Sequence, residues 1–231
     1  ASPDPLQYRI LAELAERSQA VVVMARAAAE RLVRIYGVPA AKVHVLPHGV
    51  PLPPPGTPAE WKRKLGLQGR TVALIFGLLG PGKGIEVALE AVSLAARAVP
   101  DLLYVVAGST HPEVLRAEGE SYRRRLEQEV ARLGIAAHVQ FLDRYLAEEE
   151  LLGLLLACDI YLVPYPGRDQ TSSGTLTFAM ALGRAIVSTP FTYAEEMLPG
   201  GAGLLVPFGD PEALAGALVC LARDPLRRSV L

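Results

Sequence analysis

The stretch RTVALIFGLLGPGKGIEVALEAV, residues 70–92, decides the fold of this chain. It begins with a short apolar run rich in β-branched and aromatic residues, breaks into glycines and a proline, and resumes with helical spacing. This order predicts a buried strand, a tight loop and a helix. Gly77 and Gly82 let the loop backbone approach a ligand closely, and Lys83 stands where the helix is expected to begin. Because a helix N-terminus carries unpaired N–H groups, a lysine beside it predicts a site for an anion, most naturally a phosphate.

The glycine-rich loop also matches the opening of the phosphate-binding motif G-x-x-x-x-G-K-[ST]. Gly84 stands where that motif needs the hydroxyl that holds magnesium, which counts against a P-loop nucleotide hydrolase. A glycine-rich turn with a solvated lysine remains an alternative. Lys83 is, however, the only lysine after Lys64, because the chain uses arginine for its other cations there. Since the two cations are not interchangeable, this isolated lysine favours a specific role.

Composition and charge bound the class of protein. The 231 residues are 51% hydrophobic and carry a formal net charge of -1, with acidic and basic residues interspersed. A chain of this size forms one large α/β domain, or one domain and part of another. The near-zero charge provides no basic surface for nucleic acid, so no nucleic-acid partner is expected. No apolar run reaches the roughly 18 residues of a membrane span and no secretory signal is recognised, so we expect a cytoplasmic protein without a transmembrane segment.

Several chemically notable side chains have ordinary explanations. The run Arg123 to Arg125 is interpreted as a solvated face of a helix. Cys158 and Cys220 are isolated in apolar helical stretches, which predicts buried, reduced thiols rather than a disulfide or a metal site. His111 is interpreted as solvated or structural, because nothing near it in sequence orients it as a base or a ligand.

A proline-rich segment divides the chain. Residues 47–56 contain five prolines, which cannot continue a helix or a sheet and favour an extended, stiff connection. Before this segment, the spacing predicts helix, strand, helix and strand over 6–17, 20–24, 27–36 and 42–46. The chain begins with Ala-Ser-Pro rather than methionine, so we expect a piece of a longer protein. A domain boundary near residue 50 is therefore predicted, separating 1–50 from 51–231.

Beyond the linker, each apolar run is followed by an amphipathic helix. Such alternation, with strands that are apolar on both faces, predicts an α/β fold with a Rossmann-like parallel sheet and helices on both faces. Ligands bind these sheets past the carboxyl ends of the strands, near the topological switch point. The expected strands are 72–76, 102–107, 139–142, 160–163, 185–188 and 204–206, and the expected helices are 84–98, 121–133, 148–157, 174–182, 193–198 and 211–221.

Two loops that follow strands carry candidate binding groups. Gly108 opens a small, polar loop and is placed to contact a base or a sugar through its backbone. Arg144 follows the strand 139–142 and is a candidate for contact with an anionic ligand. A surface ion pair between Arg144 and Glu148 is the alternative.

The segment 164–176 places several hydroxyls and a glycine between a strand and a helix. One explanation is ordinary capping of that helix. The other is a second anion pocket whose N–H groups face the same ligand as Lys83, and two such helix starts on one sheet suggest a diphosphate. The residues concerned are Ser172, Ser173, Gly174 and Thr175.

The order of these segments resembles the family 4, or group 1, retaining glycosyltransferases of the GT-B architecture. The resemblance covers nearly the whole chain and rests on the order and spacing of motifs that are each loose. The matching pieces are VHVLPHGV (43–50), Phe76-Gly77 with Lys83-Gly84, VVAG (105–108), ACDIYLVP (157–164), AMALG (179–183) with IVST (186–189), and GLLV (203–206) with Gly209-Asp210.

This resemblance implies two domains and a divided donor site. Residues 51–231 would be the nucleotide-sugar-binding domain of the C-terminal half, and residues 1–50 a remnant of the N-terminal acceptor domain with the hinge. The family grips the donor diphosphate with an arginine and a lysine. Lys83 matches that lysine, whereas Leu78 stands at the arginine position.

The family also carries two glutamates eight positions apart, the earlier holding the donor sugar and the later the ribose. The matching positions here are Gln170 and Phe178. Gln170 can still hydrogen-bond a sugar hydroxyl, but Phe178 cannot replace a carboxylate. Other polar groups are then expected to compensate. The candidate hydroxyls are Ser172, Ser173 and Thr175, and the candidate acid is Glu195 or Glu196.

The implied activity is transfer of a sugar, with mannose and glucose as candidates, from a nucleotide diphosphate sugar with retention of configuration. Lys83 and Gln170 are the candidate catalytic residues, Lys83 stabilising the leaving diphosphate. No metal and no cofactor besides the donor substrate is expected.

The partners that the resemblance implies are the nucleotide-sugar donor and a carbohydrate or lipid-linked acceptor held by the N-terminal domain. Polysaccharide biosynthesis is the expected setting, with peripheral membrane attachment as an option for the whole protein. A catalytically degenerate nucleotide-binding or scaffold domain of the same fold is the alternative. The isolated chain is expected to be inactive, because a second domain completes the site.

Overall fold

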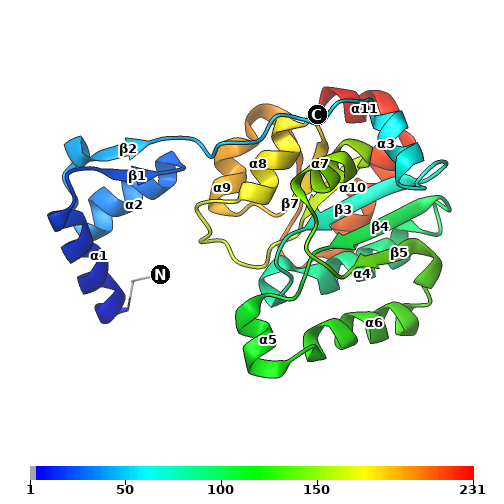
Figure 1. Ribbon diagram of the computed structural model, residues 1–231, viewed down its shortest axis with the longest axis horizontal. Coiled ribbons are helices and arrows are strands. Elements are labelled where there is room, and N and C mark those ends of the chain that lie inside the picture. The colour runs from blue at the N-terminus through cyan, green and yellow to red at the C-terminus, as the bar shows by residue number, and fades with distance from the viewer. Residues whose placement is uncertain (1–3) are drawn as a thin grey trace.

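Six parallel strands form the central sheet of the larger part of the molecule (Figure 1). The computed structural model describes residues 4–231. The strands are β3 Thr71–Phe76, β4 Leu102–Ala107, β5 Val139–Leu142, β6 Ile160–Val163, β7 Ala185–Ser188 and β8 Leu204–Leu205. Their order is β5-β4-β3-β6-β7-β8, so the chain builds outward from β3 on one side and from β6 on the other. This confirms the predicted Rossmann-like α/β fold and puts the topological switch point between β3 and β6.

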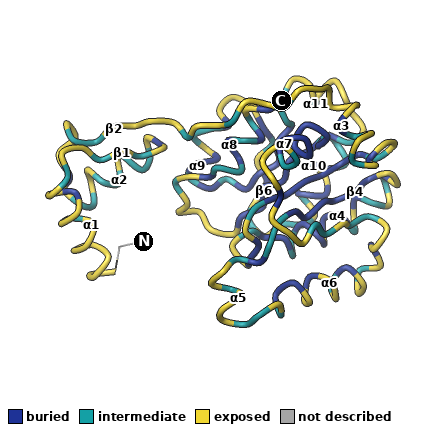
Figure 2. The backbone as a smooth tube through the Cα atoms, viewed as in Figure 1, coloured by how far each residue is buried: buried dark blue, intermediate teal, exposed yellow. Residues whose placement is uncertain are grey.

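Helices cover both faces of this sheet. One face carries α3 Pro58–Lys64, α7 Glu148–Ala157, α8 Gly174–Ala181 and α9 Thr192–Met197; the other carries α4 Ile85–Ala95, α6 Ser121–Leu133 and α10 Pro211–Arg223. Successive side chains of β3 therefore enter two cores, Leu74 packing beside α7 and α8 and Ile75 beside α4 and α10. Every residue of β3 and β4 is buried, and Figure 2 shows this buried centre in dark blue.

Residues 5–45 form a small separate unit, at the left of Figure 1. It contains α1 Pro5–Arg17, β1 Val21–Val23, α2 Arg26–Tyr36, a 3₁₀ turn Ala40–Lys42 and β2 Val43–Val45, with β1 and β2 paired in parallel. Among its described residues only Ala15, Ala25 and Val38 are buried, whereas Leu14 and Val22 are more than half exposed. A two-stranded sheet with so small a core does not stabilise itself, so this unit depends on contacts outside it.

The linker between the two parts is attached to the larger part near both of its ends. His48 lies against Gly174 at the start of α8, so closely that a Cβ on Gly174 would come within 2.9 Å of His48 Nε2. At the other end, Trp61 Nε1 donates to the Pro55 carbonyl over 3.1 Å. Trp61 itself is 4% exposed and packs on Gly153 of α7. No helix or strand forms between residues 46 and 57.

Most elements lie where the spacing predicts them. The strands 102–107, 139–142, 160–163 and 185–188 have the predicted bounds. The helix predicted over 84–98 is shorter and spans Ile85–Ala95. It begins after Gly84 because that residue takes a left-handed φ of 65°. Sequence reasoning missed α3, α5 Pro112–Glu118 and α11 Pro225–Val230. Each of these begins with a proline preceded by a capping side chain, from Thr57, His111 and Asp224 respectively.

The expected surface position of the arginine run is wrong for Arg123. Its side chain is 6% exposed, and Nη2 donates to the Gly108 carbonyl over 2.8 Å and lies 2.7 Å from Asp143 Oδ1. Arg124 and Arg125 are exposed, as predicted. The burial of Arg123 follows from its place on the inner face of α6, between the loops that follow β4 and β5.

The two cysteines are free thiols. Cys158 is buried as predicted, and burial raises the pKa of its thiol. Cys220 is only partly buried, and an Arg227 guanidinium nitrogen lies 3.0 Å from its Sγ.

Candidate functional site

Two loops meet at the carboxyl ends of β3 and β6. Lys83 Nζ, from the glycine-rich loop after β3, donates to the Tyr165 hydroxyl over 2.9 Å. That hydroxyl is also 2.9 Å from Thr175 Oγ1 at the start of α8, and Ser173 Oγ lies 3.3 Å from the same Thr175 oxygen. The structure therefore brings together Lys83, Ser173 and Thr175, three of the residues singled out in the sequence, at the topological switch point.

Glycines let the backbones of this site approach one another. A Cβ on Gly108 would lie 2.0 Å from the Gly77 carbonyl oxygen, and one on Gly84 would lie 1.9 Å from the Pro164 carbonyl oxygen. No side chain fits at either position. A Cβ on Gly77 would instead meet Thr175 Cγ2 at 3.5 Å and Lys83 Nζ at 3.6 Å. Gly77 thus keeps open the space between the lysine and α8.

The N-terminus of α8 faces this space. Ser173 is its N-cap residue, and Ser173 Oγ accepts from the Leu176 N–H over 3.2 Å. The capping explanation of these hydroxyls is therefore correct for Ser173. The first N–H groups of any helix have no acceptor within the helix, so Gly174 and Thr175 also present their N–H groups at the positive end of the α8 dipole. The cap is therefore confirmed at this helix start, and the anion pocket stays a prediction.

Two adjoining pockets flank Leu78, which is 46% exposed. The first has a volume of about 180 Å³ and is mostly apolar, with the backbone of Gly77 and Gly108 on its wall. The second has a volume of about 210 Å³ and holds Lys83. The apolar pocket is suited to a flat ring, and the neighbouring pocket with Lys83 is suited to an anion. Together they are suited to a ligand that carries both groups. The first pocket is lined by Phe76, Gly77, Leu78, Ala107, Gly108, Ser109, Tyr145, Leu146 and Leu151, and the second by Leu78, Gly80, Pro81, Gly82, Lys83, His111, Val114, Tyr165 and Gln170.

Gln170 and Ser172 lie at the rim of this site. The Gln170 side chain lines the second pocket, and its Nε2 donates to the Ser172 carbonyl over 2.8 Å. Ser172 is exposed. The backbone of Gln170 is held in turn, since its carbonyl accepts from the Tyr193 N–H over 3.1 Å.

The structure does not bring Arg144 or Glu196 into this group. Arg144 forms a two-pronged ion pair with Glu150, rather than the suggested pair with Glu148. The hydrogen bonds of this pair raise the pKa of Arg144 and lower the pKa of Glu150. Glu196 turns away from both pockets and binds the start of α2, through the Arg26 and Ala27 N–H groups. Glu195 pairs with Arg168.

A row of aromatic rings lies next to the first pocket, of which Phe76 is a lining residue. Phe178 is one turn into α8, with its ring centroid 6.2 Å from that of Phe76 and 6.0 Å from that of His48. The pair with His48 is edge-to-face. Phe178 itself lines neither pocket, and its ring packs between Phe76 and the imidazole of the linker.

Sequence reasoning missed two residues of this region. Tyr165 connects Lys83 to Thr175, and its position directly after a buried strand and a proline was an available signal. Arg123 supports the site from beneath through the Gly108 carbonyl, which only the three-dimensional contact reveals. Among residues 4–231, no group of three or more His, Cys, Asp or Glu side chains is arranged to hold a metal ion. In the same part of the chain, every helix is too short or too polar to cross a bilayer.

Known proteins share this sequence pattern. A family model described as glycosyl transferases group 1 matches residues 70–224. The GDP-mannose-dependent alpha-(1-6)-phosphatidylinositol monomannoside mannosyltransferase of Mycolicibacterium smegmatis is 27% identical over 98% of this chain and 59% of its own length. The D-inositol 3-phosphate glycosyltransferase of Stackebrandtia nassauensis is 31% identical over 100% of this chain and 52% of its own length. The chain thus spans between 52% and 59% of the length of these two relatives.

Solved structures share the fold. The HepE protein of Anabaena, in complex with UDP and glucose, superposes with a TM-score of 0.81 at 21% identity, over 97% of this chain and 59% of that one. The C-terminal domain of the group 1 glycosyl transferase LpcC from Francisella tularensis gives a TM-score of 0.62 at 23% identity, over 78% of this chain and 91% of that one. The chain belongs to the group 1 glycosyltransferases and has the fold of the C-terminal part of a GT-B enzyme.

Proposed function

We propose that residues 51–231 bind the nucleotide diphosphate part of a sugar donor, within a metal-independent retaining glycosyltransferase that transfers a hexose. The observation that carries this proposal is the meeting of Lys83, Tyr165 and Thr175 at the switch point, where the glycine-rich loop after β3 reaches the segment 164–176. In this reading the apolar pocket beside Gly108 takes the base, and the diphosphate lies between Lys83 and the start of α8. Mannose and glucose are the candidate sugars, the first because the Mycolicibacterium relative uses GDP-mannose.

The chemical role of the site is to stabilise a leaving group. In sugar transfer, the bond from the anomeric carbon to the diphosphate oxygen breaks and its electron pair leaves with the diphosphate. The acceptor hydroxyl oxygen bonds to the anomeric carbon on the face that the diphosphate leaves, and its proton passes to the departing diphosphate oxygen. Negative charge grows on the diphosphate in the transition state, and Lys83 with the N–H groups of Gly174 and Thr175 lies where that charge develops. Gln170, at the pocket rim, is assigned to a hydroxyl of the sugar.

The small unit 5–45 is assigned to the end of an acceptor-binding domain. Its exposed apolar side chains and its short sheet need a partner, and the rest of such a domain is the partner that a GT-B chain supplies. That domain would bind a carbohydrate or a lipid-linked acceptor and close over the donor. We assign the whole protein to the cytoplasm, at a membrane surface where its acceptor is lipid-linked, and to polysaccharide synthesis.

A catalytically degenerate binding domain is the second candidate. Leu78 offers no charge at the rim shared by the two pockets, and Phe178 is packed in an aromatic row. Both features reduce the polar contacts available to a donor. Nucleotide binding without any sugar transfer by the full-length protein identifies this case.

Calorimetric titration tests the proposal. The 231-residue chain is titrated with UDP, GDP and ADP in the absence of metal, and the variants Lys83→Ala and Lys64→Ala are titrated in parallel. We expect one nucleotide to bind and its affinity to fall at least tenfold in Lys83→Ala, since a charged contact contributes about 1.5 to 3 kcal/mol. Lys64 lies on α3 outside both pockets. The variant Lys64→Ala removes the same charge as Lys83→Ala, but it should bind the nucleotide like the wild type. Equal affinities for both variants and the wild type would refute the assignment of Lys83.

A further inference from the structure

Helix α2 begins without a capping side chain of its own. Its N-cap residue is Ala25, which provides no acceptor, and Glu196 supplies one from 170 positions away in the sequence. Glu196 Oε1 accepts from the Arg26 N–H over 2.8 Å, and Oε2 accepts from the Ala27 N–H over 3.0 Å. The carboxylate thereby satisfies two orphan donors and places its charge at the positive end of the α2 dipole. The side chain of Glu196 is 19% exposed, so water competes little for this contact.

A second contact joins α2 to the loop of residues 164–173, which we call the donor loop. Arg31 Nη2 lies 3.1 Å from Asp169 Oδ1, and Nη1 donates to the Asp169 carbonyl over 3.2 Å. One guanidinium fork thus holds both the side chain and the main chain of Asp169. The next residue, Gln170, lines the pocket that contains Lys83.

A third set of contacts joins α9 to the same loop. The Thr192 N–H and Oγ1 both donate to the Arg168 carbonyl over 2.9 Å, and the Tyr193 N–H donates to the Gln170 carbonyl over 3.1 Å. Hydrogen bonds therefore join each pair of these three elements, namely helix α2, helix α9 and the donor loop. The loop cannot shift relative to α9 without straining its contact with α2.

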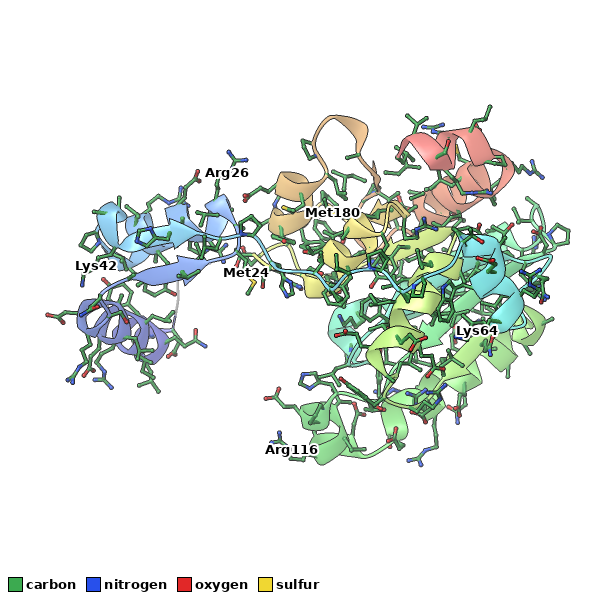
Figure 3. All side chains as sticks on the ribbon, turned by 45° about the horizontal axis from the view of Figure 1, so that its top comes forward. Met24, Arg26, Lys42, Lys64, Arg116 and Met180 are labelled. Carbon is green, nitrogen blue, oxygen red and sulfur yellow. The ribbon has the colours of Figure 1, made fainter. Side chains whose placement is uncertain are left out.

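The figures show the same arrangement. Helix α9 is the part of the larger unit that lies toward α2 in Figure 1. In Figure 3, Met24 and Arg26 lie at the end of the small unit that faces the larger one, whereas Lys42 lies at the opposite end. The small unit thus touches the donor domain through the start of α2 and through Arg31, besides the linker.

We propose that Glu196 and Asp169 form a clasp that fixes the N-terminal unit to the donor loop, so that the docked position of α2 sets the geometry of Gln170 at the nucleotide pocket. Glu196 is then a positioning residue that never touches the ligand. The effect on the nucleotide rests on the function proposed above, whereas the clasp itself does not. The clasp has its own readout, amide hydrogen exchange, which needs no ligand.

Hydrogen exchange of the 231-residue chain, followed in short peptides without nucleotide, tests the clasp. In Glu196→Ala we expect exchange to accelerate about tenfold both in the first turn of α2 and in the donor loop. Glu196→Gln keeps one acceptor oxygen and should lie between the alanine variant and the wild type. Faster exchange in α2 with an unchanged donor loop overturns the coupling.

A rescue variant distinguishes coupling through the clasp from a simple loss of stability of helix α2. Ala25→Ser in the Glu196→Ala background gives α2 a cap of its own, since serine is a preferred N-cap residue. We expect the first turn of α2 to regain protection while the donor loop stays loosened. If the donor loop also regains protection, Glu196 acts only by stabilising the helix and the proposal fails.

The second test of the proposal measures the affinity of the variants for the nucleotide that binds the wild type. We expect it to fall about three- to tenfold in Glu196→Ala and in Arg31→Ala, although neither residue lines either pocket of the site. Unchanged affinity together with a loosened donor loop overturns the link from clasp to site. If no nucleotide binds the wild type, the proposed function fails, and the exchange data still decide whether the clasp exists.

Discussion

Lys83 donates a hydrogen bond of 2.9 Å to the hydroxyl of Tyr165, which is itself 2% exposed. The ammonium group is therefore anchored to the floor of the site instead of moving freely on a flexible stem. Because that hydroxyl also contacts Thr175, the tyrosine sets the distance between the lysine and α8. A diphosphate bound there meets a cation already in place, which lowers the entropy lost on binding.

Tyr165→Phe tests this anchoring. The ring still fills its place, but Lys83 loses its acceptor, so we expect nucleotide affinity to fall about fivefold, the equivalent of about 1 kcal/mol. Tyr104→Phe is the control, because it removes a buried hydroxyl on β4 that has no hydrogen-bond partner among the described residues. Calorimetry on both variants decides, and an unchanged affinity in Tyr165→Phe would show that the lysine does not need its anchor.

Leu78→Arg should strengthen nucleotide binding. Leu78 is 46% exposed and borders both pockets, so a guanidinium there reaches the space beside Lys83 without displacing core side chains. A charge-assisted contact to a diphosphate predicts roughly a tenfold gain in affinity, with a steeper loss as salt is added. Leu78→Met, which changes shape without charge, is the matched comparison. If arginine and methionine behave alike across a salt series, no diphosphate lies at this rim.

Gly108→Ala should unfold the chain far more easily than Gly82→Ala. At Gly108 a Cβ would lie 2.0 Å from the Gly77 carbonyl oxygen and the φ is 127°, whereas at Gly82 nothing lies within 4 Å. We expect a loss of about 3 kcal/mol or more for the first variant and less than about 1 kcal/mol for the second. Urea denaturation of the two variants provides the comparison, and equal midpoints would mean that the two loops do not pack as described.

Asp101 should make stability depend on pH in the acid range. Its Oδ2 accepts from Thr71 Oγ1 over 2.7 Å, and this hydrogen bond lowers the pKa of Asp101 in the folded chain. A carboxylate with a lowered folded pKa stabilises the fold fully above its unfolded pKa of about 3.9, and this contribution disappears as pH falls through the folded value. Asp101→Asn should therefore reduce the slope of stability against pH below about pH 4. Thermal unfolding from pH 3 to pH 7 measures it, and parallel curves for the two proteins would contradict the prediction.

The two thiols should differ in reactivity. Cys158 is 1% exposed and burial raises the pKa of its thiol, so little thiolate forms in the native state. Cys220 is only partly buried and should react with a thiol reagent first. We expect one rapid and one protected thiol under native conditions, and two rapid ones in denaturant. Cys220→Ser should abolish the rapid phase, and a rapid phase that survives this change would locate it at Cys158.

The sequence predicts the central strands of the sheet well, because a strand that is buried on both faces requires only a short run of apolar residues. In the run 102–107 every residue is apolar and every residue is buried, so composition alone defines the strand. The capped helices were also open to prediction, since Thr57-Pro58 and Asp224-Pro225 carry the signal of a helix start.

The site was less predictable, because its geometry depends on contacts between distant residues. Lys83 was found through its loop, but its partner Tyr165 is 82 positions away. Arg123 sits in a charged run that normally faces solvent, yet it fits under the Gly108 carbonyl. Glu196 is predicted from the sequence as an acid that compensates for the missing glutamates, whereas its oxygens bind the start of α2. Helix α2 lacks a capping side chain of its own, and that absence was the signal in the sequence.

The attachments of the linker limit how the two units can move. Trp61 holds the linker at Pro55, and His48 lies against Gly174, so the linker is attached to the larger unit at these two points. Only the backbone torsions at Leu46 and Pro47 remain between β2 and the first of these anchors. Proline fixes its own φ, which leaves very few degrees of freedom at this joint. Any reorientation of the small unit relative to the larger one should therefore come from the few free backbone torsions at residues 46 and 47. It should not come from bending along the whole linker.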